Sequence, residues 1–294
     1  MLRKKLTLLG GDIREIVAAN TLIKSGYNIK TFGLPKEELT DTSVARPTLA
    51  AALDNANVVI LPVKGIDEDG YLYAPNLEQE GKRLKITAAD FSSLAKDAVI
   101  YVGVASKYLR SLAIELSLQV VPLMELDPIA VPNAIPTAEG ALAVAIENSP
   151  YTVKGSRVLI LGFGRVGKAT AAMFRSVGAK VSLCSRNEKE ICDALAGGYD
   201  MRRYSGLTRV LPRSEIVINT VPALILTDEV LAHVAKNTII IDLASKPGGV
   251  DFEAAARRNI KAIHSLGLPG KCAPITAGEI LAEGIMALLE GEGE

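Results

Sequence analysis

The stretch VLILGFGRVGKATAAMFRSVGAKVSLCSRN occupies Val158–Asn187, and its pattern indicates how the second half of the chain folds. It holds an apolar run, three glycines spaced G-x-G-x-x-G, a helix-like stretch and a second apolar run. This order is typical of a strand, turn, helix and strand in which the glycines allow a tight turn and close approach of a pyrophosphate. The pattern predicts a dinucleotide site with these contact residues: Gly162, Phe163, Gly164, Arg165, Val166 and Gly167.

The residue that separates NAD from NADP is expected at the end of the second strand, where an Asp or Glu accepts a hydrogen bond from the ribose 2′-OH. This chain has Ser185, Arg186 and Asn187 at that place. A guanidinium holds a 2′-phosphate through paired hydrogen bonds, and a serine hydroxyl adds another. We therefore predict NADP(H). The alternative is that Arg186 faces solvent and Glu188 binds the ribose.

Ligands of such sheets bind at the carboxyl ends of the strands, which points to two later segments. INTVPA, at 218–223, is expected to pass the nicotinamide half of the cofactor with Thr220, Val221 and Pro222. GLPGK, at 267–271, follows the last predicted strand, and we expect a loop that covers the nicotinamide ring with Gly267, Leu268 and Pro269. Asp242 ends another strand, and we interpret it as a structural cap.

Short Val- and Ile-rich runs alternate with Ala- and Leu-rich helical stretches almost throughout the chain, which favours parallel sheets with helices on both faces. We predict an α/β protein with an N-terminal flavodoxin- or Rossmann-like domain and a C-terminal Rossmann domain. The expected boundaries are a first domain at 1–127, a hinge and connecting helix at 128–151, a dinucleotide-binding domain at 152–275, and a C-terminal helix at 276–294 that returns to the first domain. The proline-rich segment 124–136 is expected to be irregular, with a helix that starts at Thr137.

Composition excludes several classes of protein. Lys plus Arg and Asp plus Glu both number 33, so bulk charge recruits neither nucleic acid nor an anionic membrane. From the sequence, no apolar run is expected to reach the length of a membrane span. The three cysteines include no C-x-x-C pair, which favours a reducing cytoplasm, and no metal-ligand cluster is evident.

Several segments in their order and spacing carry a resemblance that runs nearly end to end. They are LGGDIRE at 9–15, NAIPTAEGALAVAIENSPYTVKGSRVLILGFGRVGKA at 133–169, INTVPA, DLASKPGGVDF at 242–252 and GLPGKCAPITAGEIL at 267–281. Together they resemble the family formed by the A subunit of dipicolinate synthase. The resemblance implies an NADP-dependent oxidoreductase that converts a dihydro- or 4-hydroxy-tetrahydrodipicolinate into dipicolinate, on the branch from lysine synthesis to spore dipicolinic acid.

The resemblance also implies that the partner is the flavoprotein-like B subunit of dipicolinate synthase, and it implies a place in the cytoplasm of the mother cell of a sporulating bacterium. We further expect a homo-oligomer, since such enzymes commonly are. A planar dicarboxylate calls for cations or backbone N–H groups at two ends. The residues expected to bind it are Asp12, Arg14, Lys64, Ser106, Lys107, Asn133 and Thr137.

No acid–base pair is evident, so the catalytic residue stays open among Thr137, Lys107 and Lys271. Asp12 has the simpler interpretation of a helix cap, and Arg14 that of a surface ion pair with Glu15 or Glu37.

Two other functions are open. One is an NADP-loaded regulatory or scaffold protein whose partner does the chemistry. The other is an enzyme similar to folate dehydrogenases or adenosylhomocysteine hydrolases, against which the low aromatic content and Ser185-Arg186 argue.

Overall fold

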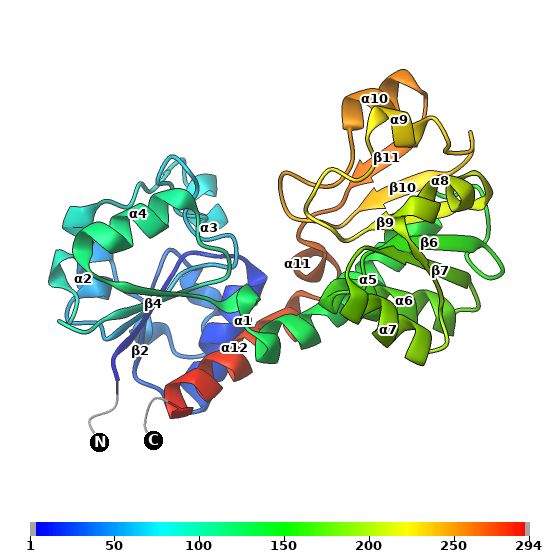
Figure 1. The fold of residues 1–294 in the computed structure, drawn as a ribbon. Helices are drawn as coiled ribbons and strands as arrows, with labels where there is room; N and C mark the ends of the chain where they lie inside the picture. The colour runs from blue at the N-terminus through cyan, green and yellow to red at the C-terminus, as the bar shows by residue number, and fades with distance from the viewer. Residues whose placement is uncertain (1–3, 292–294) are drawn as a thin grey trace. The chain divides into compact units, whose positions relative to one another are not determined.

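The computed structural model describes residues 4–291, which form two compact units. The first unit extends to Pro132 and resumes at Ala273, and the second comprises Asn133–Cys272. Each unit contains one parallel β-sheet with helices on both faces (Figure 1). The predicted fold class is thereby confirmed.

The sheet of the first unit has five parallel strands in the order β2-β1-β3-β4-β5. This is the strand order of flavodoxin-like sheets, in which the order reverses between β1 and β3. Leu6 of β1 lies opposite Ile29 of β2 on one side and Val58 of β3 on the other. The strands are β1 (Leu6–Leu9), β2 (Ile29–Phe32), β3 (Val58–Ile60), β4 (Val99–Val102) and β5 (Gln119–Pro122).

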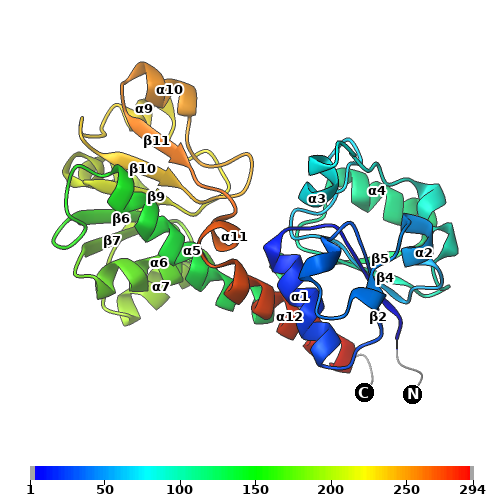
Figure 2. The same ribbon diagram turned by 180° about the vertical axis from the view of Figure 1, so that it is seen from behind.

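Successive residues of each strand enter different cores because side chains alternate between the faces of a sheet. Leu6 and Leu8 pack under α1 (Ile13–Lys24) and α12 (Pro274–Gly291), whereas Leu9 packs under the helices of the other face. Those helices are α2 (Leu49–Leu53), α3 (Pro75–Gln79) and α4 (Lys107–Leu116). Figure 2 shows α1 and α12 side by side although they come from opposite ends of the chain.

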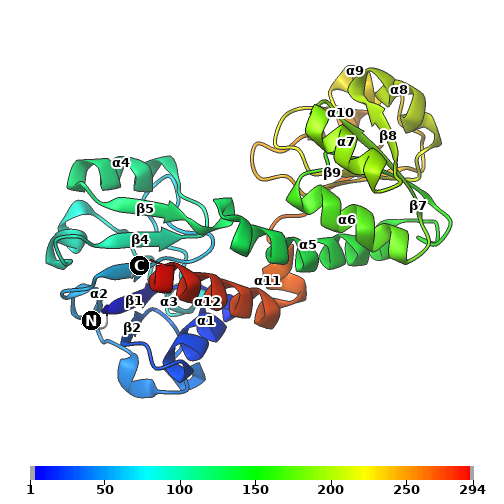
Figure 3. The same ribbon diagram turned by 60° about the horizontal axis from the view of Figure 1, so that its bottom comes forward.

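The sheet of the second unit has six parallel strands in the order β11-β10-β9-β6-β7-β8, which is the order of dinucleotide-binding Rossmann domains. One face is covered by α6, α7, α11 and part of α5, and the other by α8, α9 and α10 (Figure 3). The strands are β6 (Arg157–Leu161), β7 (Lys180–Ser185), β8 (Asp200–Arg203), β9 (Ile216–Asn219), β10 (Ile239–Asp242) and β11 (Lys261–His264). The helices are α6 (Arg165–Ser176), α7 (Glu188–Ala196), α8 (Leu207–Val210), α9 (Asp228–Leu231), α10 (Phe252–Arg257) and α11 (Leu268–Cys272).

The expected irregular segment with a helix start at Thr137 is wrong. A single helix, α5, runs from Asp127 to Asn148 and contains Pro128, Pro132 and Pro136. A proline cannot donate the helical bond to the carbonyl four residues earlier. Pro128 lies in the first turn, where no helical bond is lost, and Pro132 and Pro136 are four residues apart, so the two missing bonds fall on one side of the helix and the rest of its ladder continues. Thr137 therefore lies inside the helix, and its hydroxyl donates to Asn133 O at 3.0 Å.

Helix α5 is also the one described helix that is long and apolar enough, by length and composition, to cross a membrane, which corrects the sequence-based expectation that no apolar run is long enough. In the structure 39% of its apolar window is buried. Ala141 and Ala145 are fully buried in the core beside β6 and α6. The apolar character of this segment thus reflects a partly buried core helix.

Candidate functional site

The glycine turn joins β6 to α6, and it leaves no room for a side chain at Gly162 or Gly167. Gly162 has φ +88°, and a Cβ there would lie 2.7 Å from Thr220 Oγ1. A Cβ at Gly167 would lie 2.5 Å from Gly162 O. The first of these glycines is required by backbone conformation, and the third by the close packing of helix on turn.

A cavity of about 420 Å³ opens at this turn, at the carboxyl ends of β6 and β9. The first N–H of the helical ladder is that of Lys168, bonded to Gly164 O, so the N–H groups of the preceding turn lie outside the ladder. Phe163 is buried against Tyr199, so its side chain is not available to a ligand. A helix start of this kind suits a pyrophosphate. The lining residues are Gly162, Gly164, Arg165, Val166, Gly167, Glu190, Thr220, Val221 and Pro222.

Glu190 is a residue of this site that sequence analysis missed. Its Oε2 accepts hydrogen bonds from Phe163 N–H at 2.9 Å and from the Ser185 hydroxyl at 2.6 Å. Its other oxygen, Oε1, lies 3.7 Å from the place where a Gly164 Cβ would be. One carboxylate oxygen is therefore held by two donors while the other faces the glycine turn.

The position of Glu190 in its helix explains how it reaches the turn. Asn187 caps α7 and accepts from Glu190 N–H at 3.2 Å, which is half of a capping box. In a complete capping box the glutamate would bond back to the N–H of the cap residue. Here Ser185 Oγ accepts from Asn187 N–H at 3.1 Å instead, which leaves the carboxylate available to the turn. The sequence N-x-x-E was the signal that could have drawn attention to Glu190.

The other residues at and after the end of β7 differ in whether their side chains are free to bind a cofactor. Ser185 is buried and its hydroxyl is already bonded to Glu190. Glu188 pairs with both terminal nitrogens of Arg203, so the alternative that Glu188 serves as the ribose ligand lacks structural support. The Arg203 guanidinium, through its hydrogen bond, holds the pKa of the Glu188 carboxyl below its usual value. Arg186 is exposed, and within residues 4–291 it has no carboxylate partner.

A buried polar pair holds the segment that follows β9. Asn219 Nδ2 donates to Val221 O at 2.9 Å and to Asp242 Oδ1 at 2.7 Å, and its Oδ1 accepts from Val221 N–H at 3.2 Å. Asp242, fully buried, also accepts from Ala244 N–H at 3.1 Å and Gly249 N–H at 2.8 Å. The Asp242 carboxylate thus binds groups at the end of β9 and in the loop after β10. Together Asn219 and Asp242 fix the backbone of Val221 at the cavity.

The expected loop at 267–271 is instead helix α11, which corrects the prediction for this segment. Leu268 is 4% exposed and packs in the core beneath α5 and β6, where a Cβ at Gly140 would lie 2.8 Å from it. Pro269 is buried as well. Gly267, with φ +67°, forms the turn before the helix, and Lys271 is exposed in its last turn. Leu268 and Pro269 are therefore core residues, and a contact of theirs with a nicotinamide has no support here.

In the first unit the loops after β1 and β3 hold a cluster of charged residues. Arg14 is 5% exposed, and its guanidinium donates to both oxygens of Asp12, at 2.9 and 2.8 Å. Burial disfavours the Asp12 charge, but Arg14 outweighs it and lowers the pKa of the Asp12 carboxyl. Arg14 is therefore neither a surface ion pair with Glu15 or Glu37 nor a cation free to bind a substrate.

Glu15 anchors the same cluster and was also missed by sequence analysis. It is fully buried and accepts from Asp12 N–H at 2.7 Å and from Val63 N–H at 2.8 Å. Burial raises its pKa. The side chain ties the turn after β1 to the end of β3, at the point where the strand order reverses.

Lys64 completes this cluster. Its Nζ lies 4.0 Å from the centroid of the Tyr73 ring, whose hydroxyl donates to Asp12 Oδ2 at 3.4 Å. Among the described residues no carboxylate pairs with Lys64. The structure therefore brings together three of the predicted substrate residues: Asp12, Arg14 and Lys64.

The remaining predicted substrate residues have other surroundings. Ser106 caps α4 by accepting from Leu109 N–H at 3.2 Å, and Lys107 is exposed with its N–H directed at Glu68 Oε1 at 3.4 Å. Asn133, Thr137 and Lys271 belong to the second unit. Because Thr137 lies within α5, it has no helix N-terminus to offer a carboxylate, which corrects that prediction. Among residues 4–291 no group of three or more His, Cys, Asp or Glu side chains could hold a metal ion.

The second unit defines the class of protein. Residues 139–254 match the family model of the NAD-binding domain of D-isomer-specific 2-hydroxyacid dehydrogenases, so the glycine turn belongs to a nicotinamide-dinucleotide domain of the dehydrogenase type. Residues 5–124 match the model of the N-terminal domain of the dipicolinate synthase A subunit. The chain is 32% identical over 286 residues to the dipicolinate synthase A subunit of Bacillus subtilis, covering 97% of this chain and 95% of the relative. It belongs to the family of dipicolinate synthase A subunits.

Solved structures agree with this assignment. The dipicolinate synthase A subunit from Bacillus halodurans is 33% identical, with a TM-score of 0.89 and 97% of each chain covered. Its counterpart from Bacillus subtilis is 30% identical, with a TM-score of 0.89 and 99% and 98% of the two chains covered. A transhydrogenase from Sinorhizobium meliloti, 14% identical with a TM-score of 0.69, shares the fold. Membership of this family replaces the two alternatives of a folate-dehydrogenase-like and an adenosylhomocysteine-hydrolase-like enzyme. The family name also implies that a second kind of subunit exists.

Proposed function

We propose that this chain is an NADP-dependent oxidoreductase that converts a dihydrodipicolinate into dipicolinate. The observation that carries the proposal is the glycine-turn cavity in a member of this family. Exposed Arg186 follows Ser185, whose hydroxyl bonds to Glu190 of the cavity lining. The name of the family implies a second kind of subunit, and we place both in the cytoplasm of a sporulating cell. A homo-oligomer stays a prediction.

The reaction balances without a metal or a side-chain nucleophile. A ring carbon gives up a hydride and the ring gives up a proton to water, so that dihydrodipicolinate and NADP⁺ yield dipicolinate, NADPH and a proton. A 4-hydroxy-tetrahydrodipicolinate would first lose water. When bound, the oxidised nicotinamide would supply the hydride acceptor. Formation of an aromatic ring favours the product, so the chain mainly has to position its ligands.

Cofactor choice follows from two opposed charges at the end of β7. Arg186 is a cation without a carboxylate partner among the described residues, which suits a 2′-phosphate. Glu190 places a carboxylate oxygen at the turn, which suits a ribose hydroxyl and repels a phosphate. We propose that Arg186 binds the 2′-phosphate while Glu190 accepts from the neighbouring 3′-OH. The preference for NADP over NAD then depends on the attraction of Arg186 for the 2′-phosphate relative to its repulsion by Glu190.

Substrate recognition is proposed for the loops of the first unit. Lys64 and Lys107 are cations at the carboxyl ends of β3 and β4, where a parallel sheet receives ligands. Each could pair with one carboxylate of the substrate. Asp12 and Arg14 saturate each other and, with Tyr73, position Lys64.

Turnover tests the proposed reaction. The purified chain is mixed with NADP⁺ and 4-hydroxy-tetrahydrodipicolinate made in situ from pyruvate and aspartate semialdehyde, and absorbance of NADPH and of dipicolinate is followed together. Equal rises in both, with NADP⁺ preferred over NAD⁺, are expected. If neither rises until the B subunit is added, the chain alone is not the oxidoreductase and the scaffold alternative gains.

Lys64 is tested in the same assay. Lys64→Gln should raise KM by roughly tenfold, because it removes one charge-assisted hydrogen bond to a carboxylate, and leave kcat within about twofold. Lys85→Gln is the matched control, since Lys85 is also a lysine near a tyrosine ring, 5.8 Å from that of Tyr71. An unchanged KM in Lys64→Gln, or an equal rise in the control, would remove Lys64 from the substrate site.

A further inference from the structure

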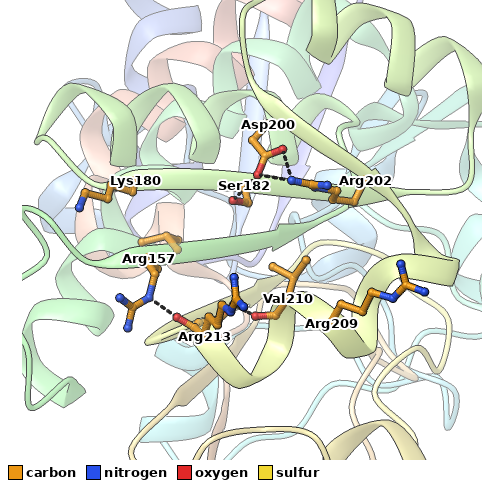
Figure 4. A pocket seen from close by; sticks show the side chains of 10 residues that line it. Arg157, Lys180, Ser182, Asp200, Arg202, Arg209, Val210 and Arg213 are labelled. Atoms are coloured by element: carbon orange, nitrogen blue, oxygen red, sulfur yellow. Dashed lines mark hydrogen bonds and ion pairs between the residues drawn. The ribbon is translucent and has the colours of Figure 1, made fainter.

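A second cavity lies at the opposite ends of the strands that carry the glycine turn. It measures about 390 Å³ and is shown in Figure 4. Arg157, Lys180 and Asp200 begin β6, β7 and β8, so this cavity is at the amino ends of the sheet, whereas the glycine turn follows the carboxyl end of β6. Its other wall is the segment 209–214 between β8 and β9. It is therefore separate from the cofactor cavity.

The lining is strongly basic although the chain as a whole has no net charge. Five of its side chains are cations and one, Asp200, is an acid. Arg202 pairs with Asp200 at 3.1 Å, and Arg157 pairs with Glu215 at 3.1 Å. Within the described part of the chain the other three, Lys180, Arg209 and Arg213, have no carboxylate partner.

The cations come from both walls of the cavity: Lys180 and Arg209 extend toward opposite sides, and Arg213 lies between them. Figure 4 shows Lys180, Ser182 and Arg202 on the strands and Arg209 and Arg213 on the facing segment. Ser182 Oγ donates to Asp200 Oδ2 at 3.2 Å, and Arg157 Nε donates to Arg213 O, so part of each wall is held in place. Unpaired cations around one cavity repel each other, and a multiply charged anion relieves this repulsion. Guanidinium groups bind phosphate oxygens through paired hydrogen bonds.

We propose that this cavity is a binding site for a small phosphorylated molecule, held by Arg213 and by the positive charge of Arg209 and Lys180 at its two sides. Its volume suits a compact ligand of this kind. The site lies away from the glycine turn, so its occupant is an effector of the chain and not its nicotinamide cofactor.

The test is a calorimetric titration of the chain with inorganic pyrophosphate at low salt, which measures the dissociation constant. Arg209→Gln combined with Arg213→Gln should weaken the binding by at least roughly tenfold, since each charge-assisted hydrogen bond is lost. Both residues are exposed and without carboxylate partners among residues 4–291, and a thermal melt checks that the variant folds. Pyrophosphate bound at the glycine turn contributes equally to every variant, because the substitutions lie at the other end of the sheet.

The control removes the same charge from the same unit. Lys236→Gln combined with Arg257→Gln alters two cations away from the cavity and should bind pyrophosphate as the unaltered chain does. Equal binding in all three proteins would overturn the proposal. Tighter binding of pyridine-2,6-dicarboxylate than of pyrophosphate at this site would overturn the phosphate assignment.

Discussion

Gly167→Ala is expected to weaken NADP⁺ binding by at least roughly tenfold and to lower the free energy of unfolding by about 1–3 kcal/mol. The added Cβ would lie 2.5 Å from Gly162 O, which is a backbone atom and cannot move without the turn. The start of α6 must then shift away from the place where a pyrophosphate binds. Calorimetric titration with NADP⁺ and thermal unfolding measure the two effects.

Gly206→Ala is the matched control for this substitution. Gly206 lies in the same unit with φ −97°, and the nearest atom to its added Cβ would be Arg202 Cβ at 3.9 Å. This variant should bind NADP⁺ as the unaltered chain does. A Gly167→Ala protein with normal affinity would show that the cofactor does not use this turn.

Arg186→Asp is expected to weaken NADP⁺ binding by at least roughly tenfold while NAD⁺ binding changes little, because it replaces a phosphate ligand with a repelling charge. Glu190→Gln should shift the ratio of the two affinities in the other direction. Its side chain oxygen can still accept from Phe163 and Ser185, while its amide presents a donor where the carboxylate oxygen faced the turn. Dissociation constants for both dinucleotides, measured without substrate, give the result.

Glu188→Gln controls for the loss of one negative charge at the start of α7. Glu188 is exposed and pairs with Arg203, so its substitution should leave both affinities unchanged. If Arg186→Asp lowers the affinities for NADP⁺ and NAD⁺ equally, Arg186 does not contact a 2′-phosphate. If Glu190→Gln lowers both equally, Glu190 only stabilises the turn. These outcomes are independent of turnover, so they separate an error in cofactor choice from an error in the proposed reaction.

The opposite charges of Arg186 and Glu190 show where sequence reasoning about this site was incomplete. The inference of NADP began from the lack of an acid at the end of β7. The structure places an acid there from the first turn of α7, through a hydrogen bond to Phe163, 27 residues away. The cap pattern N-x-x-E marks Glu190, but no sequence pattern shows that its carboxylate reaches Phe163, because that contact depends on how α7 packs beside the glycine turn.

Arg14 and Thr137 illustrate the same limit in other ways. Arg14, expected to bind substrate or else to form a surface ion pair, is buried in a pair with Asp12 because Glu15, Val63 and Tyr73 enclose the turn after β1. Thr137, expected to start a helix, lies within one because three prolines spaced by four residues leave most of its hydrogen bonds intact. In both cases the local preference of the residue was outweighed by its surroundings.

The sequence by itself determined those features of the fold that depend on residues close together in the chain. The spacing of Gly162, Gly164 and Gly167 predicted the turn, and the alternation of apolar strands and helices predicted two parallel α/β domains. The sequence also led us to expect that the C-terminal helix returns to the first domain. Only the tertiary structure decided that its partner there is α1, that Leu268 is a core residue and that Glu190 faces the glycine turn. The physical reason is that turn geometry and side-chain periodicity are set over a few residues, whereas burial and hydrogen-bond partners are chosen among groups that meet only when the chain has folded.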